Sequence, residues 1–433
     1  MSILDKIGSL AKRRGFFFPD SEIYGGISGV WDYGPLGVEI KRNIKDLFWK
    51  EMIANHENIV GIDASILMNP KVWEASGHLE SFTDSLVECK NCHHRFRWDE
   101  IVERYKNKCP DCGGPLTLPK KFNLLMETYL GVVEGEKTKT YLRGEITQGV
   151  HINFKNILNT TRMKIPFGVI QIGKAFRNEI TPSQFTFRSR EFEQMELQFY
   201  THPSEANKWM GYWKEQRFNW YLNLGFKKDD LSFKEHQKDE LAHYAKSAFD
   251  IQYNLDGEWK EMEGIHNRGD WDLKRHQEFS KQDLSYYDGE TKEKYLPWII
   301  ETSGGVDRVI LFLLASAYKE EKERIVLKLN PKIAPYKAAV FPLLANKQKL
   351  VDKAQDVFQI LKKFFMVGWD DRGNIGKRYY AQDEIGTPFC ITIDFESLEK
   401  NDVTVRNRDT MKQVRVKIKN LVEYLQEKIN GNY

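Results

Sequence analysis

The chain lacks any long uncharged apolar run, and no segment approaches the 18–20 or so apolar residues that a membrane-spanning helix requires. Its first segment, residues 1–12, has neither an apolar stretch nor a small-residue cleavage site, so a secretory signal is not expected. An excess of one charge is also missing, because 65 Lys and Arg accompany 62 Asp and Glu. The net charge of +3 neither requires nor excludes a polyanionic partner. We therefore expect a cytoplasmic protein with no membrane segment.

Cysteine is scarce, with five residues in 433. Four of them fall into two tight pairs and the fifth, Cys390, stands alone in an apolar segment. This arrangement does not resemble a disulfide framework. Cys390 is expected to be a core residue.

The length of 433 residues exceeds what one hydrophobic core usually serves, and 41% apolar residues suffice for folded cores. No internal repeat or low-complexity tract is present. Pro331 and Pro335 indicate a linker, so we expect domains at 1–330 and 331–433. Within the first, residues 86–119 form a separate insertion around the paired cysteines.

Apolar periodicity predicts a helix over 36–53, followed by a strand over 59–68 that stops at Asn69-Pro70. Further elements are expected as strands at 168–176, 188–200, 259–265 and 295–302, and as helices at 207–226 and 304–318. The charged run 319–324 is expected to be a solvated helix end. Beyond the linker, strands at 338–343, 379, 389–394 and 402–406 alternate with helices at 347–364 and 411–429. This alternation is typical of a compact α/β domain.

The paired cysteines have the spacing of a zinc ribbon. Cys89-x2-Cys92 and Cys109-x2-Cys112 are separated by sixteen residues, and Gly113-Gly114 suits a tight turn after the second pair. Four thiolates complete the tetrahedral coordination of Zn²⁺ and leave no open position, so the site is expected to be structural. Accidental pairs or a redox centre are the alternatives.

Two neighbouring predicted strands each carry one polar face. Gln171, Gly173, Ala175 and Arg177 alternate with apolar residues in the first strand. The returning strand alternates in the same way, with Arg190, Phe192, Gln194, Glu196 and Gln198 on its polar face. Small residues leading to an arginine leave space for a ligand above the sheet. A half-exposed sheet with surface ion pairs is the alternative.

A third segment favours ligand binding. Residues 301–308, Glu-Thr-Ser-Gly-Gly-Val-Asp-Arg, are expected to begin a helix, where glycines allow close backbone approach and anions are favoured. Arg308 in the first turn is unfavourably placed for the helix dipole unless a phosphate lies beside it.

These segments together resemble class II aminoacyl-tRNA synthetases. Residues 176–179 (Phe-Arg-Asn-Glu) followed by 187–192 (Phe-Arg-Ser-Arg-Glu-Phe) resemble motif 2, residues 301–308 resemble motif 3, and the helix–strand–Pro70 unit resembles motif 1. Segments 31–37, 142–149, 264–268 and 386–390 occur in the order found in the homodimeric glycyl-tRNA synthetase family. The resemblance covers almost the whole chain.

The resemblance implies an α+β fold, with the antiparallel class II sheet, flanking helices, the zinc-ribbon insertion and a C-terminal α/β anticodon-binding domain. It implies a homodimer that joins glycine to tRNA(Gly), with ATP and Mg²⁺. Arg177 and Arg308 would be catalytic, on the α- and γ-phosphates. The implied ATP and Mg²⁺ ligands are Arg177, Asn178, Glu179, Phe187, Arg188, Phe192, Glu261, Met262, Gly305 and Arg308, with Phe192 stacked on adenine. The implied glycine pocket consists of Glu145, Glu196, Arg268, Glu301 and Ser303.

Some neighbours depart from the family pattern. Gly144, Ile146 and Thr147 stand where Pro, Thr and Ala are more usual, and His266 stands where Ala is. The C-terminal cations Lys412, Arg415, Lys417 and Lys419 could contact phosphates of tRNA, or could simply form a solvated basic helix.

Three other hypotheses explain parts of the sequence. A prolyl, threonyl or histidyl enzyme would share the motifs, but the set Glu145, Glu196 and Ser303 disfavours these specificities. A non-catalytic accessory subunit would not need Arg177, Arg308 and Glu301. A general zinc-ribbon nucleic-acid-binding protein would account for the cysteine insertion alone.

Overall fold

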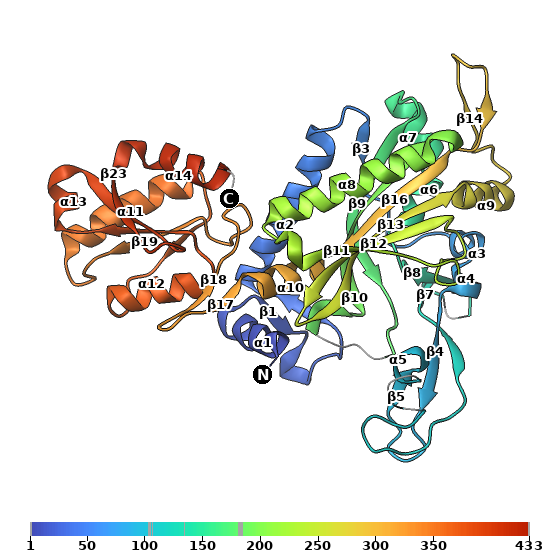
Figure 1. Ribbon diagram of the computed structural model, residues 1–433, viewed down its shortest axis with the longest axis horizontal. Coiled ribbons are helices and arrows are strands. Elements are labelled where there is room, and N and C mark those ends of the chain that lie inside the picture. Colours follow the sequence, from blue (N-terminus) through green and yellow to red (C-terminus); the bar gives the residue numbers. More distant parts are fainter. Residues whose placement is uncertain (1, 103–104, 106, 134, 181–184, 432–433) are drawn as a thin grey trace.

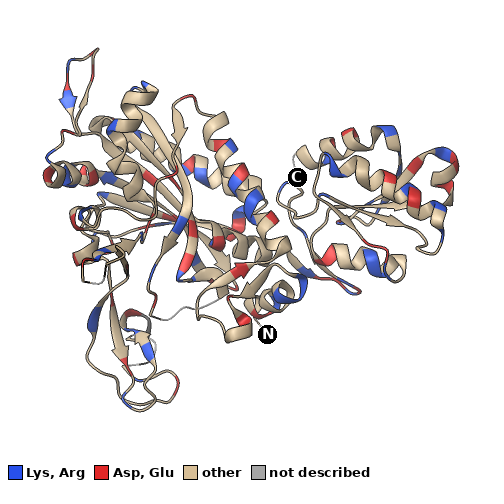
Figure 2. Ribbon diagram, turned by 180° about the vertical axis from the view of Figure 1, so that it is seen from behind, with Lys and Arg blue, Asp and Glu red and all other residues tan. Residues whose placement is uncertain are grey.

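The structure is a computed structural model that describes residues 2–102, 105, 107–133, 135–180 and 185–431. A large body forms around an extended sheet, a smaller α/β body contains the C-terminal part of the chain, and a small three-stranded insertion projects from the large body away from the C-terminal one (Figure 1). Positions of both charge signs are distributed over both bodies, in keeping with the small net charge (Figure 2). None of the helices in the described part combines the length and apolarity needed to cross a bilayer.

The central sheet has seven strands in the order β11-β12-β13-β16-β10-β9-β3. All neighbouring pairs are antiparallel except β3 with β9. The strands are β3 (Ile59–Gly61), β9 (Phe167–Phe176), β10 (Glu191–Thr201), β11 (Leu231–Glu235), β12 (Ser247–Leu255), β13 (Glu258–Gly269) and β16 (Trp298–Gly305). The register places Glu196 opposite Ser303, and His266 opposite Glu301.

One face of this sheet is the apolar core. Met195, Leu197 and Phe199 of β10 are buried with helices α2 (Pro35–Ala54), α8 (Ala206–Leu224) and α10 (Val306–Ala317) in the largest apolar cluster. Burial of one such side chain stabilises the fold by about 1.5–3 kcal/mol. The predicted alternation along β10 is confirmed, because Phe192, Gln194 and Glu196 lie on the opposite face and line a cavity.

Several short elements surround the sheet. Helices α6 (Thr147–Ile152), α7 (Phe154–Thr161) and α9 (Trp271–Ser280) contribute to a second apolar cluster. Helix α1 (Ile3–Arg14) precedes hairpin β1 (Phe17–Pro19) and β2 (Trp31–Tyr33), and α3 (Lys71–Ala75) and α4 (His78–Ser81) follow β3. The remaining hairpins are β7 (Met126–Leu130) with β8 (Thr138–Leu142), β14 (Tyr286–Tyr287) with β15 (Lys294–Tyr295), and β17 (Tyr318–Glu320) with β18 (Ile325–Leu327).

The insertion is a three-stranded sheet in the order β5-β4-β6. Its elements are β4 (Thr83–Glu88), β5 (Arg95–Arg97), α5 (Trp98–Ile101) and β6 (Lys120–Asn123). Cys89 directly follows the end of β4 that pairs with β5, and it forms an isolated bridge with Leu116. The sheet itself extends a few residues beyond the expected range 86–119 on both sides.

The C-terminal body has a five-stranded sheet in the order β20-β19-β21-β22-β23, parallel among the first three strands and antiparallel among the rest. Its strands are β19 (Ala338–Pro342), β20 (Val367–Trp369), β21 (Phe389–Ile393), β22 (Asp402–Asn407) and β23 (Gln413–Lys417), and its helices are α11 (Gln348–Lys362), α12 (Ile375–Glu384), α13 (Phe395–Lys400) and α14 (Leu421–Asn430). It has its own apolar cluster. The boundary at residue 330 stays a prediction.

Several expected elements were wrong. The strand expected over 59–68 ends at Gly61, because only its first three residues pair with β9 at the sheet edge. Tyr379 lies on α12, where its hydroxyl contacts Thr392 Oγ1 at 2.6 Å. The helix expected over 411–429 begins with strand β23, because its Val-Arg-Val alternation pairs with β22.

The charged run 319–324 is a hairpin and not a solvated helix end. Arg324 is buried, and its Nη1 donates to Asp383 Oδ2 at 2.6 Å. Arg406 also donates two hydrogen bonds to Asp383. The sequence of the run does not show this ion pair, since its partner lies 59 residues away.

Candidate active site

A cavity of about 510 Å³ opens on the polar face of the central sheet. Side chains of β10, β13 and β16 form its floor, and α4, β4 and the segment that precedes α6 form part of its wall. Of the site residues expected from sequence, the cavity is lined by Glu145, Arg177, Glu179, Phe187, Arg188, Phe192, Glu196, Glu261, Met262, Glu301, Ser303, Gly305 and Arg308.

Asn178 and Arg268 do not line the cavity. Asn178 donates its backbone N–H to the Leu124 carbonyl at 2.8 Å. Arg268 is 1% exposed and lies behind Glu301, bonded to both Glu301 oxygens at 3.0 and 3.1 Å and to both oxygens of Asp272. Arg268 therefore fixes the position of Glu301 from outside the cavity.

Small residues on β9 do not leave space for a ligand as expected. A Cβ at Gly173 would lie 2.3 Å from Arg143 Nη2, because the Arg143 guanidinium covers this part of the strand. Arg143 donates to the carbonyls of Lys174 and Ala64, each at 2.6 Å. The floor of the cavity consequently comes from the neighbouring strands.

Ser303 and Glu301 lie within strand β16 and not at a helix start. Gly305 caps α10, and Arg308 stands in the first turn as expected. Gly304 and Gly305, at the end of β16, differ in their roles. A Cβ at Gly304 would meet the buried carboxylate of Glu263 at 3.0 Å, whereas Gly305 borders the cavity.

Glu196 lies at the buried end of the cavity and accepts hydrogen bonds at both oxygens. Oε1 accepts from Ser303 Oγ at 2.7 Å and Gln194 Nε2 at 3.0 Å, and Oε2 accepts from Thr147 Oγ1 at 2.6 Å and Gln198 Nε2 at 3.3 Å. Burial raises the pKa of the Glu196 carboxyl to about 8, and the charges of Glu301 and Glu145 act in the same direction. This group therefore needs a positive partner to remain ionised at neutral pH.

The pKa of Glu301 is shifted in the opposite direction from that of Glu196. Burial raises its pKa, but Arg268 and His266 outweigh this effect and lower the pKa to about 2. His266 Nδ1 lies 3.1 Å from Oε1, and Gln198 Nε2 donates to Oε2 at 2.8 Å. Glu301 is thus an ionised carboxylate whose oxygens are already occupied by protein donors.

Glu145 is the carboxylate with an available oxygen. His78 Nε2 lies 3.3 Å from its Oε1, which also accepts from Gln148 Nε2 at 3.0 Å. Burial raises the pKa of Glu145, but His78 and then Arg268 outweigh it and hold the pKa below its usual range. Within the part of the chain that the structure describes, Oε2 of Glu145 has no hydrogen-bond partner. An ionised oxygen facing a cavity with two further carboxylates is suited to a small cation such as an ammonium group.

Arg177 and Arg308 lie on the other side of these carboxylates. Arg177 Nε donates to the Gly144 carbonyl at 3.0 Å, and its guanidinium carbon lies 5.1 Å from the ring centroids of both Phe82 and Phe192. Among the described residues, its terminal nitrogens have no hydrogen-bond partner. The guanidinium is therefore held in place while two of its nitrogens remain available to an anion.

Arg308 contacts the second strand of the floor. Its Nη1 lies 3.0 Å from Glu261 Oε1, and its guanidinium lies over the Phe187 ring at 4.6 Å. Nearby, burial raises the pKa of the Glu179 carboxyl, and Arg188 Nε lies 4.0 Å from it. Two arginines and two carboxylates around one opening can bind a polyphosphate together with a divalent cation.

Sequence reasoning missed several residues that complete the cavity, above all Thr147, Tyr244, Asp307, Phe82 and Arg97. Thr147 lies within segment 142–149 and was noted only as a departure from the family pattern, so its position two residues after Glu145 was an available signal. Asp307 accepts from the Glu193 backbone N–H at 2.6 Å, and no local pattern indicates this contact.

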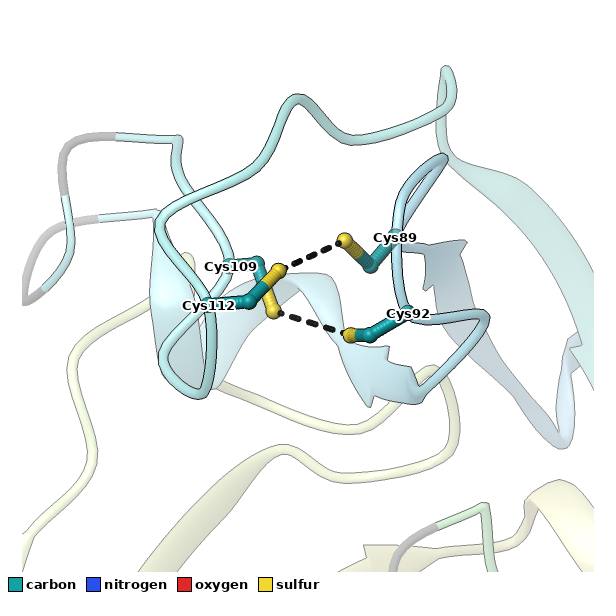
Figure 3. A group of neighbouring side chains, drawn as sticks. All are labelled: Cys89, Cys92, Cys109 and Cys112. Carbon is teal, nitrogen blue, oxygen red and sulfur yellow. Dashed lines mark hydrogen bonds between the residues drawn. The ribbon is translucent and has the colours of Figure 1, made fainter.

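The four paired cysteines converge at one point of the insertion (Figure 3). Sγ atoms of Cys89 and Cys112 lie 3.4 Å apart, those of Cys92 and Cys109 lie 3.6 Å apart, and all four lie within 4.8 Å of one another. Zn–S bonds of about 2.3 Å in a tetrahedron place sulfurs roughly 3.8 Å apart, whereas a disulfide requires about 2 Å. The four-sulfur donor set therefore fits zinc. Gly113 has φ +70°, as the expected tight turn requires.

Comparison with known proteins agrees with this geometry. The family "tRNA synthetase class II core domain (G, H, P, S and T)" matches residues 132–317, and "Anticodon binding domain" matches residues 337–428. The antiparallel sheet, its two arginine motifs and these matches define a class II aminoacyl-tRNA synthetase.

Curated relatives specify the family further. "Glycine--tRNA ligase" of Borrelia hermsii is 50% identical over 98% of this chain and 97% of the relative. "Glycine--tRNA ligase" of Treponema denticola is 50% identical over 99% of this chain and 97% of the relative. That of Geobacillus kaustophilus is 49% identical over 98% of this chain and 99% of the relative. The chain belongs to the glycine–tRNA ligase family.

Proposed function

We propose that this cavity activates glycine with ATP and transfers it to the 3′ end of tRNA(Gly). The three buried carboxylates at one end, beside two arginines, carry this proposal. The glycine ammonium would lie among Glu145, Glu196 and Glu301, with Ser303 at the floor and Arg268 holding Glu301. An anionic amino-acid side chain would be repelled there, and the enclosed end favours the smallest amino acid.

The first step requires charge neutralisation more than proton transfer. The glycine carboxylate is already an anion when it attacks the α-phosphate and displaces pyrophosphate, so no general base is needed. Arg177 would contact the α-phosphate, and Arg308 the γ-phosphate, while Phe192 offers a ring for adenine. Mg²⁺, with Glu261 or Glu179 as candidate ligands, would neutralise further phosphate charge. The assigned ATP ligands Phe187, Arg188, Met262 and Gly305 belong to the same proposal, whereas Asn178 lies outside the cavity lining and its backbone N–H is bonded to Leu124.

Pyrophosphate exchange with each of the twenty amino acids tests the substrate assignment. Exchange that depends on glycine and not on proline, threonine or histidine is expected. Exchange with one of these other amino acids would reject the glycine pocket while leaving the class unaffected. An inactive protein that binds tRNA would support the accessory-subunit alternative.

The cysteine cluster is expected to hold one structural zinc per chain. Coordination by four thiolates leaves no open position, so zinc would stabilise the insertion and take no part in the chemistry. Protein purified without chelator should contain one equivalent of zinc by metal analysis, and Cys109→Ser should lose it. Cys390→Ser is the control, because Cys390 is buried in the C-terminal body. Zinc-free wild-type protein, or Cys109→Ser with a full equivalent, would contradict the assignment.

The C-terminal body is expected to be separable from amino-acid activation, because no site residue lies beyond residue 330. A chain ending at Asn330 should perform glycine-dependent exchange but charge tRNA poorly. Truncation exposes Leu327 and Leu329 and removes Asp383 from buried Arg324, so solubility must be verified by gel filtration. A folded truncated protein without exchange would place the C-terminal body in the active site.

A homodimer is expected through the α2–β3 edge of the large body. Trp49 of α2 is 41% exposed and Val38 39%, and β3 is a short edge strand. Sedimentation should give a dimer, and Trp49→Glu should shift it towards monomer. Trp259→Glu, at a similarly exposed residue of β13, is the control. A wild-type monomer would contradict this expectation.

The cytoplasmic location expected from the sequence also stays a prediction.

A further inference from the structure

The segment between α3 and the insertion contacts both halves of the cavity. His78 begins the short helix α4, and Phe82 follows this helix one turn later. His78 contacts the carboxylate end of the cavity, and Phe82 contacts the catalytic arginine. Neither residue is among the ligands assigned to glycine or ATP above.

His78 is 4% exposed and is held on three sides. Its Nδ1 lies 2.8 Å from Ser76 Oγ, and its ring packs against Trp73 and Phe82 at 5.2 and 5.0 Å between centroids. Its Nε2 faces the ionised Glu145 at 3.3 Å, so this nitrogen carries the proton. The imidazole therefore fixes one oxygen of Glu145 and leaves the other towards the cavity.

Phe82, like Phe192, packs against the guanidinium of Arg177. Both ring centroids lie 5.1 Å from the guanidinium carbon. Gly144 allows this approach, since a Cβ there would lie 2.9 Å from Phe82 Cε1. The carbonyl of Gly144 also accepts from Arg177 Nε. Two aromatic contacts and a hydrogen bond at Nε hold the Arg177 guanidinium in place.

Backbone hydrogen bonds join this segment to the arginine motif. Leu124 N–H donates to the Phe82 carbonyl at 3.0 Å, and Asn178 N–H donates to the Leu124 carbonyl at 2.8 Å. Asn123 Nδ2 donates to the carbonyls of His78 and Leu79, both at 3.0 Å. Segment 78–82 and the chain beside Arg177 are thus connected through β6.

We propose that His78 and Phe82 form one positioning unit, which sets the distance between Glu145 and Arg177. This inference rests on the proposed function, in which Glu145 binds the glycine ammonium and Arg177 binds the α-phosphate. The reacting carboxylate must lie in line with the α-phosphate, so the spacing between these two anchors controls attack. One helical turn carrying both contacts keeps that spacing constant.

The test is a pair of double-mutant cycles measured by glycine-dependent pyrophosphate exchange. Phe82→Leu removes the ring and should lower kcat by about tenfold or more, since small displacements of a reacting group have large effects on rate. Phe82→Tyr keeps the ring and should recover most of this loss. His78→Ala should raise KM for glycine by about tenfold with KM for ATP unchanged, and His78→Gln, which retains a donor, should recover part of it.

The cycles separate positioning from general support of the fold. If Phe82 acts through Arg177, Phe82→Leu should have no further effect on kcat in an Arg177→Ala background. His78→Ala should likewise have no further effect on glycine KM in a Glu145→Gln background. Additive losses in either cycle, or a single variant with unchanged kinetics, would overturn the inference. If Arg177→Ala alone left the rate of exchange unchanged, the proposed function would be overturned instead.

Discussion

Arg177→Ala should lower the rate of glycyl-adenylate formation by about 10²–10³, the usual effect of removing one preorganised charge contact from a transition state. Arg177 is held by Gly144, Phe82 and Phe192, while its terminal nitrogens stay available. Arg177→Lys should restore little, because an ammonium cannot use two planar donors in that slot. The fold should persist, since Arg177 forms no ion pair within the described residues.

Arg308→Ala should lower the rate of glycyl-adenylate formation by a similar factor, but for a different reason. Arg308 pairs with Glu261, so its removal leaves a carboxylate that repels the phosphate group. Initial rates of pyrophosphate exchange at saturating glycine and ATP measure both variants. Arg275→Ala is a matched control, because Arg275 lies on α9 outside the cavity lining. Near-normal exchange in either active-site variant would remove the corresponding motif assignment.

Glu196→Gln should raise glycine KM and lower kcat/KM by an amount equivalent to roughly 1.5–3 kcal/mol, the value of a hydrogen bond to a charged group. Gln has the shape of Glu without its charge. Because its Nε2 cannot accept, two of the four hydrogen bonds that Glu196 accepts are lost or rearranged as well. Ser303→Ala removes one of these donors and slightly enlarges the floor. The preference for glycine over alanine should therefore narrow without reversing.

The raised pKa of Glu196 gives the same substitution a second measurable effect. Because the folded pKa, about 8, exceeds the ordinary value near 4.3, a proton stabilises the folded state, and this contribution is lost progressively as the pH rises from about 4.3 to 8. Gln has no such loss. The free energy of unfolding of Glu196→Gln relative to wild type should therefore increase between pH 5 and pH 9, by up to about 4 kcal/mol.

Denaturant titrations at pH 5, 7 and 9 measure this slope, and exchange kinetics with glycine and alanine measure the catalytic effect. Glu278→Gln, on the exposed surface of α9, is the control for both. A surface ion-pair role for Glu196 predicts less than about 0.5 kcal/mol in either measurement. Unchanged glycine kinetics would remove the glycine assignment and leave the class II fold intact.

The sequence alone was enough to predict those parts of the chain whose structure follows from a single residue periodicity or from a fixed ligand geometry. The helix α2, the alternating faces of β10 and the four-cysteine cluster could all be read from residue spacing, because each depends on near neighbours or on a fixed ligand geometry. The motif resemblance likewise named the residues around the cavity, because these types recur at fixed intervals.

Only the tertiary structure decided which groups meet and in which electrostatic state. Arg268 and Glu301 are far apart in the sequence, and their contact depends on the pairing of β13 with β16. Glu145 and Glu196 are also far apart, and the charge of Glu145 raises the pKa of Glu196 only because the fold brings both to one cavity. Both side chains are buried glutamates, yet the pKa is raised at Glu196 and lowered at Glu301, because Arg268 pairs with Glu301 and not with Glu196. Arg324 and β23 were misassigned for the same reason: their partners, Asp383 and β22, become neighbours only once the C-terminal sheet has folded.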